Sequence, residues 1–111
     1  MRMNAYVAGV GMTRFGKQMD KTLKGLAGEA IQLALADAGM DKTALQAAWM
    51  GNAAAGVVTG QEMIRGQVAL RELGIGKIPV INVENACASS STAFQQACAM
   101  VTAGLYDVVL A

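Results

Sequence analysis

The most constraining feature of this sequence is the stretch "PVINVENACASSSTAFQQACAMVTAGLYDVVLA", which occupies residues 79–111. It places a β-branched run before a cysteine, an apolar helical run after that cysteine, and a second β-branched run after the helix. Two strands joined by one helix favour a parallel pair with a right-handed crossover. The stretch therefore predicts an α/β fold in which helices cover a parallel sheet.

The rest of the chain alternates in the same way. Apolar residues recur at three- and four-residue steps over residues 22–39, which predicts an amphipathic helix with Thr22 as its N-cap and Gly39 as its C-terminal stop. The other expected elements are strands at residues 5–12, around Trp49, at 80–86 and at 107–111, and helices at 61–76 and about 90–103. The predicted order is β-α-β-α-β-α-β, a layered α/β fold with a mostly parallel sheet. The glycine- and alanine-rich residues 51–60 are expected to form a mobile loop.

Length and charge narrow the classes of function. At 111 residues the chain is long enough for one modest domain. Lys plus Arg number 9 and Asp plus Glu number 8, and neither sign forms a run, which argues against nucleic acid or an anionic membrane as a partner. No stretch reaches the roughly 18 unbroken apolar residues of a membrane span, and the N-terminus lacks the apolar core of a signal peptide. We therefore expect a soluble, cytoplasmic protein.

The two cysteines, Cys87 and Cys98, are predicted to be free thiols. If both lay on one helix, their spacing would separate them by about 16 Å, which is too far for a disulfide. Free thiols are typical of a reducing compartment. The chain contains no histidine, the residue that most often serves as the base for a cysteine nucleophile. Any such base must therefore come from outside these residues.

Cys87 lies where a chemically active residue is expected. The carboxyl end of a parallel strand, next to the first turn of a helix, is where open α/β sheets bind ligands. The helix dipole and free backbone amides there stabilise a thiolate, and the small neighbours Ala86 and Ala88 leave it accessible. The competing interpretation is a buried cysteine that only fills space. For Cys98, in mid-helix among alanines, core packing is the expected role.

Polar residues on either side of Cys87 are expected to shape its surroundings. The hydroxyls of residues 89–92, Ser-Ser-Ser-Thr, can cap the following helix. Glu84 and Asn85 can orient water or backbone, although a polar strand end explains them as well.

The segment "NVENACASSSTAFQQACAMVTAGLYDVVLA" resembles the nucleophile region of the thiolases, where N-x-x-C-A-S-G-x-x-A precedes an alanine-rich helix, a glycine and a strand reading D-V-x-L-A. The opening "VAGVGMTRFGK" is similar to the sterol-carrier-protein-like branch of that superfamily, and "GQEMIRGQVALRELGI" matches the helix between its second and third strands. The resemblance covers essentially the whole chain. It implies that residues 1–111 are an incomplete N-terminal part of a thiolase N-terminal domain, and a parallel strand beginning at residues 107–111 agrees with that.

By position, Cys87 matches the acylated nucleophile of that family, and its backbone amide matches one donor of the oxyanion hole. The resemblance implies an acyltransferase whose cysteine takes an acyl group from a 3-oxoacyl-CoA and passes it to coenzyme A, or runs the Claisen condensation in reverse. The family's activating histidine, second catalytic cysteine and G-x-E-x-M segment have no counterpart here, and Cys98 does not match that second cysteine. We therefore expect the chain alone to be inactive.

Two alternatives stay open. Ser90 stands where many thiolases have glycine, and "ACASSS" leans toward the "ACSSS" of β-ketoacyl synthases, which share the fold and the acyl-cysteine. A non-catalytic piece that supplies fold and dimer contacts is the second alternative. The resemblance further implies a coenzyme A thioester as substrate with no bound cofactor and no metal, a homo-oligomer, and, in this branch, a small OB-fold, zinc-ribbon partner subunit.

Overall fold

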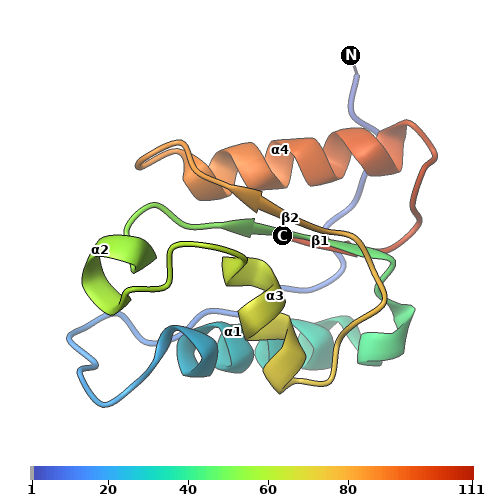
Figure 1. Ribbon diagram of the computed structural model, residues 1–111. Helices are drawn as coiled ribbons and strands as arrows, with labels where there is room; N and C mark the ends of the chain where they lie inside the picture. The colour runs from blue at the N-terminus through green and yellow to red at the C-terminus, as the bar shows by residue number, and fades with distance from the viewer. Residues whose placement is uncertain (1) are drawn as a thin grey trace.

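The computed structural model describes residues 2–111 and contains a three-stranded sheet (Figure 1). The strands are β1 (Ala47–Gly51), β2 (Val80–Val83) and β3 (Val109–Leu110), in the spatial order β2-β1-β3. Both pairings are parallel, with Trp49 opposite Ile81 and Ala47 opposite Val109. The predicted α/β class with a parallel sheet is confirmed.

Helices cover both faces of this sheet. Helix α4 (Ser89–Thr102) lies on one face, and α1 (Leu23–Ala38) lies with α3 (Arg65–Glu72) on the other (Figure 1). The remaining helical elements are the short α2 (Ala55–Thr59) and the 3-10 turn η1 (Lys42–Ala44). Across the described residues, no helix combines the length and apolar character needed to span a bilayer.

The core has two parts because alternate residues of β1 point to opposite faces of the sheet. Ala47 and Trp49 pack with Ala93 and Ala97 of α4. The indole ring of Trp49 also meets Tyr106 edge-on, with ring centroids 6.1 Å apart. On the other face of the sheet, Ala48 packs in a cluster with Leu45, Leu70 and Ile75. The small side chains on α4 let this helix approach the sheet closely.

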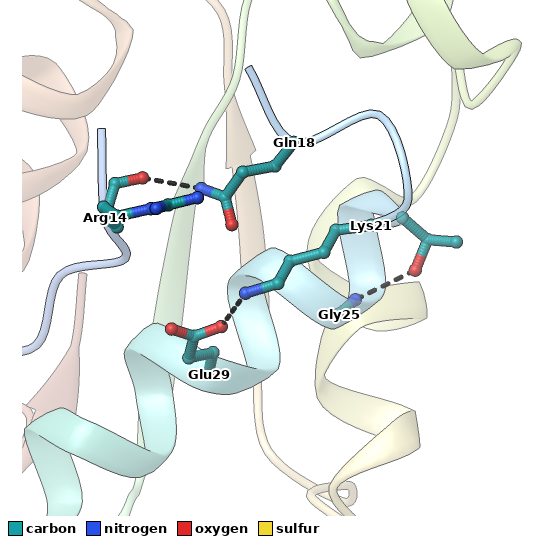
Figure 2. Close-up of polar contacts among 6 residues, drawn as sticks. Arg14, Gln18, Lys21, Gly25 and Glu29 are labelled. Atoms are coloured by element: carbon teal, nitrogen blue, oxygen red, sulfur yellow. Dashed lines mark hydrogen bonds and ion pairs between the residues drawn. The ribbon is translucent and has the colours of Figure 1, made fainter. Parts of the chain in front are cut away.

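Helix α1 begins and ends where the sequence predicted. The Gly25 amide donates a hydrogen bond to the Thr22 hydroxyl at 3.0 Å (Figure 2). At the other end, Gly39 stops the helix at φ +63°. Figure 2 also shows an ion pair between Lys21 and Glu29, which ties the residues before the helix to its second turn. Both ends of α1 are therefore set by local signals.

The first predicted strand, at residues 5–12, is wrong: the structure has no strand there. The segment lies against α1 so closely that a Cβ at Gly11 would be 2.0 Å from the carbonyl oxygen of Ala30, and one at Gly9 would be 2.5 Å from the amide nitrogen of Ala38. Glycine, with no Cβ, permits this approach. The glycines that made the segment resemble a buried strand therefore serve helix packing instead.

The N-terminal segment contacts the helices of both layers. The amide of Asn4 donates to the hydroxyl of Thr102 at the end of α4, at 2.8 Å. The amide of Val10 donates to the carboxylate of Asp37 near the end of α1, at 2.9 Å. The segment thus runs from one helical layer to the other past the sheet (Figure 1).

Two other expectations need correction. Residues 51–60 were expected to form a mobile loop, but they include α2. The side-chain oxygen of Asn52 accepts from the Ala55 amide at 2.8 Å, and Gly60 ends the helix at φ +77°.

Helix α3 also begins later than the predicted residue 61, because Ile64 at φ +46° breaks the helical path immediately before it.

The short turn that leads into β1 has its own cap. The Asp41 carboxylate accepts from the amide and the hydroxyl of Thr43, at 2.9 and 2.8 Å. These two hydrogen bonds stabilise the charged carboxylate and hold the pKa of Asp41 below its ordinary value. The bond from the Thr43 amide has the larger effect and the bond from the Thr43 hydroxyl the smaller. This fixed turn sets the point at which β1 enters the sheet.

Candidate active site

Cys87 lies in the turn between β2 and α4, and its side chain is exposed. Helix α4 begins two residues later, with Ala88 at its N-cap and no side chain capping it. Within residues 2–111, the backbone amide of Cys87 donates no hydrogen bond. The structure therefore places a free thiol and a free amide together at the start of a helix, as the sequence predicted.

The turn bends sharply at Ala86, which has a left-handed φ of +47°. Its amide donates to the Glu84 carboxylate at 2.6 Å, and its carbonyl accepts from the amide of Ser89 at 3.2 Å. The amide of Ala88 donates to the carbonyl of Asn85 at 2.9 Å. Glu84 thus orients backbone, one of the two roles expected for it, and the bend turns Cys87 outward.

Ser89 has a role that the sequence reasoning missed. Its hydroxyl does not cap α4; it accepts from the Asn85 amide at 2.8 Å and donates to the Ala86 carbonyl at 2.7 Å. Ser89 is buried, with 4% of its surface exposed. The expectation that residues 89–92 cap the helix is therefore wrong, because Ser91 also bonds a carbonyl, that of Ala88, at 3.0 Å. The hydroxyls hold the turn instead.

The end of strand β1 packs against the backbone at the start of α4. A Cβ at Gly51, the last residue of β1, would lie 2.7 Å from the amide nitrogen of Ser90 and 2.8 Å from the carbonyl carbon of Ser89. The amide of Asn52 donates to the Val83 carbonyl at 3.1 Å. Because β1 and β2 are parallel, their carboxyl ends meet at this edge, where ligands bind in open α/β sheets.

A second segment at the same edge is fixed by Arg65, at the start of α3. Its guanidinium donates to the carbonyl of Asn52 at 2.7 Å and to the carbonyl of Gln61 at 2.9 Å. Helix α2 lies between Asn52 and Gln61 in the sequence. Figure 1 shows it at the same end of the sheet as the turn before α4. The only advance signal for this arrangement is an asparagine three residues before Ala55, a common capping pattern.

Cys98 has different surroundings. It lies in the middle of α4 and is half-buried, one residue after the buried Ala97. Both cysteines are free thiols, as predicted. Among residues 2–111, no group of three or more His, Cys, Asp or Glu side chains is arranged to hold a metal ion.

Comparison with known proteins gives consistent results. A family model described as "Thiolase, N-terminal domain" matches residues 5–111. The chain is 41% identical to sterol carrier protein 2 of Gallus gallus over 113 aligned residues, which cover 100% of the chain and 20% of that protein. It is 38% identical to an acetyl-CoA acetyltransferase of Methanocaldococcus jannaschii, with 94% and 26% covered. It is also 38% identical to the benzoylsuccinyl-CoA thiolase subunit BbsB of Thauera aromatica, with 99% and 27% covered.

The chain therefore spans about a quarter or less of the length of these relatives. Among solved structures, 3-oxoacyl-[acyl-carrier-protein] synthase III of Aquifex aeolicus VF5 has a similar fold, with a TM-score of 0.63. That match covers 77% of this chain and 27% of the other, at 15% sequence identity, which supports the fold alone.

Proposed function

Since this chain belongs to the thiolase family, we propose that it forms the nucleophile-bearing part of an acyltransferase that acts on coenzyme A thioesters, with Cys87 as the residue that is acylated. The family membership supports a thiolase type of chemistry. The finer assignment of the nucleophile depends on one observation. Cys87 is an exposed thiol in the turn between a parallel strand and a helix, beside its own unbonded amide.

The proposed first step is an acyl transfer. The Cys87 sulfur attacks the carbonyl carbon of an acyl-CoA, the new carbon–sulfur bond forms, and the bond to the coenzyme A sulfur breaks. Coenzyme A leaves as a thiol, because its sulfur takes up one proton in exchange for the proton that the Cys87 thiol loses. In this proposal, the Cys87 amide donates a hydrogen bond to the substrate oxygen that becomes negative in the tetrahedral intermediate.

In the degradative direction, the Cys87 sulfur attacks the C3 carbonyl of a 3-oxoacyl-CoA, the C2–C3 bond breaks, and C2 takes up the proton lost by Cys87, so that acetyl-CoA leaves. Coenzyme A then takes the acyl group from Cys87, and its thiol proton returns to the Cys87 sulfur. The reverse condensation begins with the acyl transfer described above and then joins the acyl group to an acyl-CoA.

Residues 1–111 contain no histidine, so the base for Cys87 belongs to another segment or subunit. We propose that the chain alone does not turn over. A homo-oligomer, a coenzyme A thioester as substrate rather than a resident cofactor, and an OB-fold, zinc-ribbon partner stay predictions.

A β-ketoacyl synthase-like condensation is the second candidate. The observation in its favour is Ser90, which is exposed and stands where many thiolases have glycine. The first half-reaction is the same for both candidates. They separate at the second substrate of the condensation, because a thiolase-type enzyme joins the acyl group to a second acetyl-CoA, whereas a synthase joins it to a malonyl thioester and releases carbon dioxide.

The assignment can be tested with the intact gene product and acetyl-CoA, without a second substrate. We expect the peptide that contains Cys87 to gain one acetyl mass. Cys87→Ser should abolish this adduct and change the melting temperature little, because the side chain is exposed. Cys98→Ser is the matched control and should keep the adduct.

Two outcomes would contradict the proposal. One is an adduct that persists in Cys87→Ser. The other is a parent protein that never gains the acetyl mass although it is folded, which would favour the non-catalytic alternative. After acylation, adding acetyl-CoA or malonyl-CoA to the acyl-enzyme decides between the two candidate second steps: condensation with acetyl-CoA favours the thiolase type, and condensation with malonyl-CoA, with release of carbon dioxide, favours the synthase type.

A further inference from the structure

We infer that Ser89 is a positioning residue whose buried hydroxyl sets the direction in which the turn presents Cys87. This inference rests on the proposed role of Cys87 as nucleophile. It assigns to Ser89 an effect on the reaction that passes only through the backbone of the turn.

The first argument is the burial of a hydroxyl. Ser89 is 4% exposed, and within residues 2–111 it is the one residue with a polar side chain that is almost fully buried. A buried hydroxyl is costly unless it has hydrogen-bond partners. Both of its partners lie in the turn: it accepts from the Asn85 amide at 2.8 Å and donates to the Ala86 carbonyl at 2.7 Å. The hydroxyl is therefore committed to the backbone immediately before Cys87.

The second argument is the strained residue that this hydroxyl holds. Ala86 has a φ of +47°, which a residue with a Cβ adopts only when its surroundings enforce it. Its amide is held by Glu84 at 2.6 Å, and its carbonyl is held by the hydroxyl and the amide of Ser89. The Ala86 carbonyl belongs to the peptide group that also contains the Cys87 amide. Any rotation of that group would redirect both the amide and the following thiol.

The third argument is the tight packing of the Ser89 backbone against strand β1. The backbone of Ser89 and Ser90 lies so close to Gly51 that a Cβ there would be 2.7 to 2.8 Å away from it. Ser89 therefore cannot move toward the sheet. Asn85 is also held from a second side, since its amide nitrogen Nδ2 lies 3.1 Å from the hydroxyl of Thr92. The turn is thus fixed at both ends, and the Ser89 hydroxyl connects them.

Ser91 provides a matched control in the same turn of helix. Its hydroxyl also donates to a backbone carbonyl, that of Ala88, at 3.0 Å. However, Ser91 is exposed, and Ala88 lies after Cys87 rather than before it. Removing this hydroxyl deletes one hydrogen bond of the same kind without releasing Ala86.

The experiment compares the intact protein with Ser89→Ala, Ser89→Thr and Ser91→Ala. The single-turnover rate of Cys87 acetylation by saturating acetyl-CoA is measured by quenched mass spectrometry, and the alkylation rate of Cys87 by iodoacetamide is measured in parallel. We expect Ser89→Ala to acetylate about a hundredfold more slowly, the size of effect that a misplacement of about 1 Å produces. Its alkylation rate should change little, because alkylation needs an exposed thiol rather than a fixed direction.

The conservative variant and the control complete the test. Ser89→Thr keeps a hydroxyl and should recover most of the acetylation rate, and Ser91→Ala should acetylate like the parent. If Ser89→Ala does not fold, it is combined with Ala86→Gly, because glycine adopts a left-handed φ without strain. The double variant should then acetylate more slowly than Ala86→Gly alone.

Two results would overturn the inference without affecting the proposed function. In the first, Ser89→Ala acetylates as fast as Ser91→Ala once corrected for the folded fraction. In the second, acetylation and alkylation fall together, which would mean that the thiol is less accessible rather than misdirected. A parent protein that is never acetylated would instead remove the proposed function, and this inference with it.

Discussion

At the scale of single residues, the surroundings of each side chain decide what it can do. Cys87 and Cys98 lie in the same stretch of chain, but one is exposed in a turn before a helix and the other is half-buried within it. Ser89 and Ser91 differ in the same way, since one hydroxyl is buried and the other is exposed. The backbone around the strand-to-helix turn makes these distinctions.

We expect Cys87 to react with iodoacetamide much faster than Cys98 in the folded, intact protein. The reason is access: the Cys87 thiol is exposed, whereas Cys98 is partly covered within α4. Brief labelling followed by peptide mass mapping measures both rates in one sample. Equal labelling of the two cysteines, or a preference for Cys98, would contradict the assignment of Cys87 as the reactive thiol. Labelling in denaturant, where both should react alike, is the control.

Gly51→Ala should destabilise the protein by about 1–3 kcal/mol, the usual range for added volume in a packed site. The new Cβ would lie 2.7 Å from the backbone of Ser90, which cannot rotate away as a side chain can. Chemical denaturation gives the change in free energy of unfolding.

Gly76→Ala is the matched control for this substitution, because no atom lies within 4 Å of the added Cβ there. We expect its free energy of unfolding to stay near that of the parent. If the two alanine variants were equally stable, the close approach of β1 to the start of α4 would be wrong.

At the scale of secondary-structure elements, the ends of the helices are explained by hydrogen bonds that local sequence supplies. Thr22 and Gly39 define α1, and Asn52 and Gly60 flank α2. The N-cap residue of α4, like those of α2 and α3, makes no side-chain hydrogen bond, and the start of α4 is held by the turn before it and by its close packing on Gly51 of β1. The helix that begins at the candidate site therefore depends on contacts with other elements.

Thr22→Ala should lower the free energy of unfolding by about 0.5–2 kcal/mol, since it removes the oxygen that accepts the Gly25 amide at 3.0 Å. Thr22→Ser keeps that oxygen and should be close to the parent. Thermal or chemical denaturation of the three proteins makes the comparison. A serine variant as unstable as the alanine variant would show that the methyl group of Thr22, rather than its cap, stabilises the helix.

The sequence predicts an element well when the signals are local, and poorly when distant residues decide. The cap and stop of α1 lie within a few residues of the helix, and both predictions are confirmed. Residues 5–12 show a glycine, alanine and valine pattern that suits a buried strand or a segment packed on a helix. The choice depends on α1, whose residue Ala30 touches Gly11. Local pattern contains no information about that contact.

The candidate site divides in the same way. The position of Cys87 between a strand and a helix follows from the local order of elements, and the structure confirms that position. The burial of Ser89 does not follow from local order. It depends on Gly51, which lies on another strand, and on the bend at Ala86, which a sequence with alanine there does not indicate.

At the scale of the whole molecule, many large apolar side chains face solvent. Phe94 on the outer face of α4 is 50% exposed, and Leu105 beyond its end is 65% exposed. In the N-terminal segment, Tyr6 is 91% exposed and Phe15 is 86% exposed. Within the described chain, β3 pairs with β1 on one side and with no strand on the other. Exposed apolar surface and an open strand edge both favour association.

We therefore expect residues 1–111, expressed alone, to associate or to unfold without a sharp transition. Light scattering and thermal melting of the isolated chain are the measurements. Phe94→Gln, which makes an exposed position on α4 polar, should reduce the association, whereas Ser90→Gln, at an exposed position already polar, should not. A monodisperse monomer that melts cooperatively would contradict this expectation.

The hydrogen bond from Asn4 to Thr102 joins positions 98 residues apart in the chain. During synthesis, Asn4 leaves the ribosome well before its partner Thr102 on α4 has been made. Bringing such distant positions together has an entropic cost that must be met before the contact stabilises anything. The N-terminal segment is therefore expected to dock only after α4 has been made.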